Sequence, residues 1–208
     1  MIPAKEALKQ LREGNRRFVS RLKDRETLQC QLRRVELVKE QKPFAIILGC
    51  SDARVPAEIV FDQGLGDLFV IRIAGNIAAP SQIGSAEFAA SRFGSRLVVV
   101  LGHSRCGAIL ATIEALRRPT ESLSHNLRSI VDCVRPSVEG LLKADRPQDE
   151  DALVRQAVRA NIGLSVNHLR HGSEILGDLI RNEGLLVVGA EYSLETGLVD
   201  FFESEEPG

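Results

Sequence analysis

The chain has 208 residues, of which 44% are hydrophobic and 26% charged, so it has enough apolar material for one globular domain without disulfide bridges. The 27 Lys and Arg residues against 28 Asp and Glu residues give a formal net charge of -1, whereas nucleic-acid-binding domains usually carry a basic excess. No apolar run approaches the roughly 20 residues of a membrane-spanning helix, and the amino terminus lacks the pattern of a secretion signal. We therefore expect a cytoplasmic protein with no nucleic-acid or membrane partner.

Two amphipathic helices are expected at the amino-terminal end. Residues 4–18 place apolar side chains at mostly helical spacing with charged residues between them, and residues 26–40 repeat the pattern. Residues 1–40 are therefore predicted to form a helical arm.

The spacing of hydrophobic residues changes after this arm. Continuous apolar runs predict strands buried on both faces, and a short alternating segment near the carboxyl end predicts an antiparallel edge strand. The buried runs are 44–49, 68–73, 97–101 and 185–188, and the alternating segment is 198–202.

Helical segments lie between these strands, at 56–63, 81–93 and 109–117. Residues 121–183 are expected to form several helices, with breaks near Pro136, Pro147 and Gly172. Strands that alternate with helices predict one α/β domain over residues 1–208, with a mostly parallel sheet.

Two of the strongest strands end in a glycine and a potential metal ligand, as Gly49-Cys50 and Gly102-His103. Open α/β sheets form their sites at the carboxyl ends of strands where the strand order reverses. For the order 2-1-3-4 this point lies between the strands that end at Cys50 and His103. Cys106 follows three residues after His103.

Two thiolates and one imidazole suit zinc, and three protein ligands leave a fourth position open, as in catalytic sites. A structural His and Cys pair without a metal is the alternative for the His-x-x-Cys spacing alone. Cys50 at the facing strand end favours the metal. Cys30 and Cys133 lie in helical patterns and are expected to be buried or half-buried thiols.

The motif Cys50-Ser-Asp52-Ala-Arg54 adds a carboxylate and a guanidinium beside the first ligand. A carboxylate near a metal can bind it and block the open position, and a bidentate arginine can hold the carboxylate away. The alternative is an ordinary surface salt bridge in a loop.

These blocks resemble the β-class carbonic anhydrases over essentially the whole chain. The matching motifs are Cys50-Ser-Asp52-x-Arg54-Val-Pro, Phe69-Val-x-Arg72-x-x-Gly-Asn76, Gly-His103-Ser-x-Cys106-Gly-Ala and Gly-Ala-Glu-Tyr192-Ser-x-Glu-Thr-Gly197. The resemblance implies a parallel sheet of order 2-1-3-4 with a fifth antiparallel edge strand and helices on both faces. It also implies one Zn²⁺ per chain and the reversible hydration of carbon dioxide to bicarbonate and a proton.

The resemblance further implies a homodimer, or a dimer of dimers (a homotetramer), as the working unit. The arm of residues 1–40 would pack on the partner subunit, and the active site would lie at the interface. Arg72 could line the site or support this dimer, and we favour support of the dimer.

Several substrate-binding residues follow from motif positions. Gln41 resembles the amide that orients the substrate and that the neighbouring subunit supplies, and Phe69 resembles an apolar wall of the carbon dioxide pocket. Phe88 stands where many relatives carry a tyrosine, so it keeps the apolar surface and lacks the hydroxyl. Val55 is expected to extend the apolar wall. Gln41 or the backbone N–H of Gly107 would stabilise the developing bicarbonate oxygen.

As a mechanism, we expect zinc to lower the pKa of a water molecule from about 15.7 towards neutrality. Asp52 would accept the hydrogen of this nucleophile and orient it, and Arg54 would hold Asp52. In a closed state Asp52 would itself be the fourth zinc ligand.

One branch of the family resembles this chain but binds bicarbonate in a second, inhibitory pocket. That pocket uses a tryptophan three residues before the first cysteine ligand. Ile47 stands there in this chain, which contains no tryptophan, so we expect no cooperative inhibition by bicarbonate.

Three alternatives remain open. A hydrolase of carbonyl sulfide or carbon disulfide would share this ligand set. A non-catalytic dimer stabilised by zinc would use Asp52 as a permanent fourth ligand. A nucleotide-binding module is disfavoured because no Gly-x-Gly-x-x-Gly or Walker-type loop follows a strand.

Overall fold

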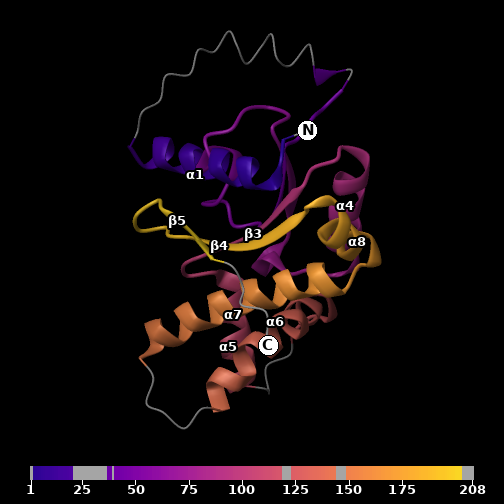
Figure 1. The fold of residues 1–208 in the computed structure, drawn as a ribbon. Helices are drawn as coiled ribbons and strands as arrows, with labels where there is room; N and C mark the ends of the chain where they lie inside the picture. Colours follow the sequence, from indigo (N-terminus) through magenta and orange to yellow (C-terminus); the bar gives the residue numbers. More distant parts are fainter. Residues whose placement is uncertain (1, 21–36, 39, 119–122, 144–148, 203–208) are drawn as a thin grey trace.

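A computed structural model of the protein describes residues 2–20, 37–38, 40–118, 123–143 and 149–202. Five strands form one sheet, and helices lie on both of its faces (Figure 1). The elements are α1 (Ala4–Ser20), β1 (Ala45–Gly49), α3 (Ala57–Val60), β2 (Leu68–Arg72), the 3-10 turn η1 (Ala74–Asn76), α4 (Pro80–Arg92), β3 (Leu97–His103), α5 (Gly107–Arg117), α6 (His125–Lys143), α7 (Glu150–His171), α8 (Glu174–Glu183), β4 (Leu186–Tyr192) and β5 (Val199–Phe202).

The strand order is β2-β1-β3-β4-β5, and only the β4–β5 pair is antiparallel. This confirms the expected order 2-1-3-4 and the antiparallel fifth strand at the edge. The register places Gly49 of β1 opposite Leu101 of β3. The residues that follow these two positions therefore emerge at the same edge of the sheet, which is where the predicted ligands lie.

Two apolar layers cover the sheet, because successive side chains of a strand point to opposite faces. Ile46 and Leu48 of β1 pack into the layer formed with α4, α5, α6, α7 and α8. Ala45 and Ile47 pack into the layer formed with α1 and α3. Both faces are buried, which explains the continuous apolar runs of the sequence.

The first helix of the predicted arm exists, and it packs on its own sheet. Ala4, Ala7 and Leu11 of α1 are buried in the same layer as β1 and β3. The second predicted helix, 26–40, lies almost wholly outside the described residues. The packing of the arm on a partner subunit stays a prediction.

Two sequence expectations about helices were wrong. The segment predicted as a helix over 56–63 is helical only from Ala57 to Val60, because Asp62 adopts a left-handed φ of 49° that an α-helix cannot include.

No break occurs at Pro136, which lies inside α6. A proline inside a helix costs about 3 kcal/mol, and here the fully buried Val134 and Val138 pack on either side of it. The break expected at Gly172 is confirmed between α7 and α8, and the one at Pro147 falls outside the described residues. None of the described helices is both long and apolar enough to cross a bilayer.

Candidate metal centre

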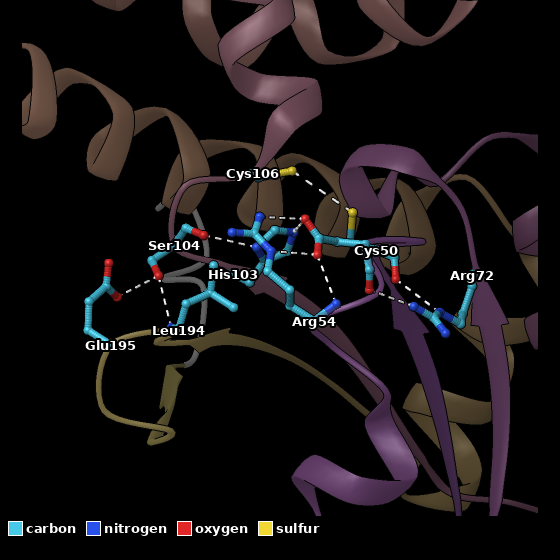
Figure 2. Close-up of polar contacts among 9 residues, drawn as sticks. Cys50, Arg54, Arg72, His103, Ser104, Cys106, Leu194 and Glu195 are labelled. Atoms are coloured by element: carbon cyan, nitrogen blue, oxygen red, sulfur yellow. Dashed lines mark hydrogen bonds and ion pairs between the residues drawn. The ribbon is translucent and has the colours of Figure 1, made fainter.

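Three potential ligands meet at the carboxyl edge of the sheet (Figure 2). Cys50 directly follows β1, His103 ends β3, and Cys106 is the N-cap of α5. Their ligand atoms all lie within 4.8 Å of one another, and all three residues are buried. The structure therefore brings together the three residues that the sequence predicted as ligands.

The imidazole of His103 is oriented for a metal. Its Nδ1 lies 2.9 Å from the carbonyl oxygen of Ser104, and since a carbonyl only accepts, Nδ1 carries the hydrogen. Nε2 therefore offers its lone pair to the cluster, and it is buried without a hydrogen-bond partner in the described structure. An unpaired buried acceptor is costly, and metal-binding histidines commonly hold their second nitrogen in this way.

The two sulfurs lie 4.0 Å apart. The contact with Cys106 lowers the pKa of Cys50, and the contact with Cys50, together with burial, raises the pKa of Cys106. Backbone N–H groups approach both sulfurs, from Asp52 and Gly75 at Cys50 and from the first turn of α5 at Cys106. These donors favour thiolates, so the cluster fits a soft divalent ion such as zinc.

Asp52 lies beside the cluster and is held by Arg54. Arg54 donates from Nε to Asp52 Oδ1 at 2.9 Å, from Nη2 to Oδ2 at 2.6 Å and from its backbone N to Oδ1 at 3.0 Å. These bonds, those of the guanidinium first, hold the pKa of Asp52 well below its usual range. Asp52 Oδ2 is 3.8 Å from His103 Nε2, so the ionised carboxylate lies next to the cluster while it remains bound to the arginine.

Arg72 supports the loop that carries these residues. It donates from Nε to the carbonyl oxygen of Cys50 at 3.1 Å and from Nη2 to that of Asp52 at 2.7 Å (Figure 2). Of the two roles expected for Arg72, at the site or in the dimer, these contacts concern the site, because they hold the backbone between Cys50 and Asp52.

The second ligand loop is fixed by a residue that the sequence analysis missed. Glu195, in the turn between β4 and β5, accepts from Ser104 Oγ at 2.8 Å and from Arg105 Nε at 3.0 Å. Ser104 Oγ also accepts from the backbone N–H of Leu194 at 3.0 Å. Figure 2 shows this connection between the His103 loop and the hairpin. The sequence could have indicated Glu195, because this residue is the second glutamate of the motif Gly-Ala-Glu-Tyr192-Ser-x-Glu-Thr-Gly197.

Two of the predicted substrate residues lie near the cluster in the sequence. Gly107 is the first residue of α5 and is exposed, directly after the ligand Cys106. Val55 is 2% exposed and packs in the layer under α1 and α3.

The other three lie elsewhere in the same chain. Phe69 of β2 pairs with Ile46 of β1, four residues before Cys50, which is about 13 Å along a strand. The rings of Phe69 and Phe88 are 6.3 Å apart, and each also contacts Phe93. Gln41 and Phe93 line one groove of about 1170 Å³. The structure thus brings these three predicted residues to one region, away from the cluster of their own chain.

Known proteins are similar to this chain in sequence and in fold. The family model described as carbonic anhydrase matches residues 45–199. Carbonic anhydrase 2 of Mycobacterium tuberculosis is 38% identical over 191 residues, which are 92% of this chain and 89% of that protein. Carbonic anhydrase of Mycolicibacterium smegmatis is 36% identical over 199 residues, with 93% and 91% of the two chains covered.

Among solved structures, the β-carbonic anhydrase CafA of Aspergillus fumigatus is similar with a TM-score of 0.75, at 24% identity and with 86% of each chain covered. A structure from a study of two tetrameric β-carbonic anhydrases of Sordaria macrospora gives the same TM-score at 22% identity, over 84% of this chain and 87% of the other. By sequence and by fold, the chain belongs to the carbonic anhydrase family, in its β class.

Proposed function

We propose that this chain catalyses the reversible hydration of carbon dioxide to bicarbonate and a proton, with one zinc ion per chain held by Cys50, His103 and Cys106. The observation that carries the proposal is the buried, unpartnered Nε2 of His103 next to two sulfurs. When bound, zinc supplies the Lewis acidity that lowers the pKa of a water molecule from 15.7 to about 7. Two free thiolates also require a reducing compartment, which agrees with the cytoplasmic location that we expect.

Asp52 and Arg54 have the arrangement that this chemistry needs. The ionised carboxylate accepts the hydrogen of the attacking water, so that an oxygen lone pair points to the carbon of the substrate. Arg54 occupies both carboxylate oxygens and so keeps Asp52 from becoming a metal ligand. The backbone N–H of Gly107, at the amino end of α5, donates to the oxygen on which negative charge develops.

The apolar part of the site comes, in this proposal, from a second subunit. Carbon dioxide needs an apolar wall with few polar guides, and Phe69, Phe88 and Gln41 would supply it. The Phe88 side chain is 55% exposed in the single chain, and Gln41 is exposed as well. A homodimer, alone or as half of a tetramer, would place these residues of the partner subunit against the metal cluster.

Mixing two variants with different defects tests this shared site. Gln41→Ala should keep its zinc and lose activity by about 100-fold, because an oriented donor is worth that much, and Cys50→Ala should lose its zinc. In a mixed dimer, one site has both an intact metal cluster and an intact Gln41. Random subunit exchange should therefore restore about a quarter of the wild-type activity, since half of the dimers are mixed and half of their sites are complete.

The control is a chain that carries both substitutions, exchanged with the wild-type chain. In that mixed dimer, one site combines an intact metal cluster with the substituted position 41, and the other combines an intact Gln41 with a cluster that lacks zinc. The exchange should therefore lower the activity per wild-type chain. Two results would show that Gln41 does not serve the partner. One is an unchanged activity per wild-type chain after exchange with the double variant, and the other is no gain of activity from the two single variants after proven exchange.

The activity itself is tested by stopped-flow measurement of carbon dioxide hydration on protein with a measured zinc content. Carbonyl sulfide and carbon disulfide should be assayed in parallel, because a hydrolase would use the same ligands. Protein that holds one zinc per chain and turns over only a sulfur-containing substrate would contradict the proposal.

Bicarbonate should not inhibit this enzyme cooperatively at pH 8. Ile47 is fully buried within β1, and its side chain offers no N–H donor. The Arg72 guanidinium already binds two carbonyl oxygens. An anion loses about 1–3 kcal/mol for each missing donor, and a ligand shifts a conformational balance only by its differential affinity. Initial rates across a bicarbonate series, with chloride as the ionic-strength control, check this, and a sigmoidal loss of rate would contradict it.

A further inference from the structure

The carbonyl oxygen of Ser104 decides how the imidazole of His103 faces the metal cluster. It lies 2.9 Å from Nδ1 of His103, so it holds the hydrogen on Nδ1 and leaves the lone pair on Nε2. This carbonyl belongs to the planar peptide group between Ser104 and Arg105. Its direction therefore depends on ψ of Ser104 and φ of Arg105, the two rotations on either side of the peptide group.

The backbone at this peptide group is strained. Arg105 has φ 55°, in the left-handed region that residues with a Cβ atom disfavour. A return of Arg105 to a negative φ would turn the peptide group and move the carbonyl oxygen of Ser104 away from Nδ1. Such a conformation persists only where the surrounding structure holds it.

Glu195 contacts both residues of this peptide group (Figure 2). Its Oε2 accepts from Oγ of Ser104 at 2.8 Å, and its Oε1 accepts from Nε of Arg105 at 3.0 Å. The hydroxyl of Ser104 also accepts from the N–H of Leu194 at 3.0 Å, and the backbone N–H of Ser104 donates to the carbonyl oxygen of Tyr192 at 2.9 Å. The end of β4 and the turn after it thus hold Ser104 at three points.

The turn that carries Glu195 is anchored by a buried residue of α1. Asn15 donates from Nδ2 to the carbonyl oxygen of Gly197 at 2.9 Å, and its Oδ1 accepts from the N–H of Val199 at 2.9 Å. The Glu195 side chain is 50% exposed, and an exposed ion pair alone contributes little. The anchored turn gives its carboxylate a defined place, so Glu195 acts by where it puts an acceptor for the Ser104 hydroxyl.

We propose that Glu195 is a positioning residue for His103 and acts through the hydroxyl of Ser104. It holds the peptide group after Ser104 so that the carbonyl oxygen faces Nδ1 and leaves Nε2 to the metal. The inference rests on the proposed role of His103 as a zinc ligand, and it adds a residue from the hairpin between β4 and β5. Outer groups that orient a metal-binding histidine raise metal affinity by about 10- to 100-fold.

Glu195→Ala and Ser104→Ala should each raise the zinc dissociation constant by about 10-fold, the lower end of that range. Competition with a chromophoric chelator measures this constant in folded protein without reference to activity. The double variant should bind zinc no more weakly than Ser104→Ala, because the two residues act through one contact. Glu195→Gln keeps an oxygen acceptor for the hydroxyl and should restore most of the affinity.

A second measurement reports on the imidazole itself. In zinc-saturated protein labelled with ¹⁵N-histidine, the Nδ1–H of His103 should give a ring N–H signal that exchanges slowly with water. The other histidines, His125, His168 and His171, are exposed and should give no such signal. The signal should weaken or vanish in Glu195→Ala and Ser104→Ala, and return in Glu195→Gln.

Glu150→Ala is the matched control. Glu150 is also an exposed carboxylate that uses both oxygens, which accept from Arg117 at 2.8 and 3.0 Å. Its removal should leave the zinc affinity and the ring N–H signal unchanged. Arg105→Ala removes the more exposed contact of Glu195 and keeps the contact with Ser104, so it should weaken zinc binding less than Glu195→Ala.

The outcomes distinguish the inference from the function on which it rests. If the wild-type protein binds no zinc, the proposed function fails. If it binds zinc and is active, while Glu195→Ala and Ser104→Ala bind zinc as tightly as Glu150→Ala, only the positioning role is refuted. A loss of affinity with an unchanged ring N–H signal also refutes that role, because the loss would then not pass through the imidazole.

Discussion

Replacing Cys50 or Cys106 with alanine should remove both the zinc and the activity. Each sulfur is one of three buried ligand atoms that lie within 4.8 Å of one another, and the two that remain cannot hold zinc in a stable tetrahedral site. Zinc content should fall from about one per chain to near zero, and hydration of carbon dioxide should fall to the uncatalysed rate. Elemental analysis and stopped-flow assays on the same samples measure both quantities.

Cys133→Ala is the control for this experiment. Cys133 is a half-buried free cysteine on α6, outside the cluster, so its replacement should change neither zinc content nor turnover. Circular dichroism establishes that each variant is folded, and Cys50→Ser offers a replacement closer in size. Wild-type activity that survives complete removal of zinc would refute the metal mechanism.

Arg54→Ala should abolish most of the activity while the zinc remains bound. The guanidinium holds both oxygens of Asp52, and Asp52 Oδ2 is only 3.8 Å from the Nε2 of His103. Without Arg54, the carboxylate of Asp52 stays ionised, and the bound zinc ion becomes the nearest cation that it can bind. It should then take the open coordination position and exclude water, with a loss of about 100-fold in kcat/KM, the upper end of what the removal of an outer-shell partner costs.

Arg105→Ala is the matched control for Arg54→Ala. Arg105 also stands two residues after a ligand and binds a carboxylate, Glu195, at 3.0 Å, and both of these side chains are well exposed. Its removal should cost little, as is usual for an exposed ion pair. Arg54→Lys should be nearly as inactive as Arg54→Ala, because lysine keeps the charge and loses the two-pronged contact.

The combination of zinc content and rate decides the role of the pair. If Arg54→Ala releases its zinc, Arg54 supports the ligand loop and does not restrain Asp52. If the zinc and the activity are both kept, the pair has no part in the chemistry.

Much of the fold was predictable because its signals are local. An apolar run such as 97–101 identifies a strand buried on both faces, whatever the rest of the chain does. Gly49-Cys50 and Gly102-His103 lie at the ends of such strands, so a rule about parallel sheets was enough to bring these two ligands to one edge. Asp52 and Arg54 are two residues apart, and the structure shows the bidentate pair that this spacing predicted.

Local signals failed where tertiary contacts outweighed them. Pro136 predicts a break when α6 is considered alone, and the burial of Val134 and Val138 overrides that preference. The motifs predict Phe69 as a wall of the carbon dioxide pocket, and the register adds that Phe69 lies near the start of β2, beside Ile46 and four residues before Cys50 along β1. The proposal that a second subunit supplies Phe69 rests on this register, which no local pattern of the sequence contains.

The α/β class, the strands and the cluster of Cys50, His103 and Cys106 were therefore predictable from the sequence, because they depend on hydrophobic period and on short motifs at the ends of strands. Only the packed chain shows which side chains hold the loops of this cluster, namely Arg72 on the loop after β1 and Glu195 on the loop after β3. These contacts join segments between 20 and 91 residues apart. Long-range pairs of this kind leave no periodic pattern in a single sequence, since they depend on how the helices and loops pack around the sheet.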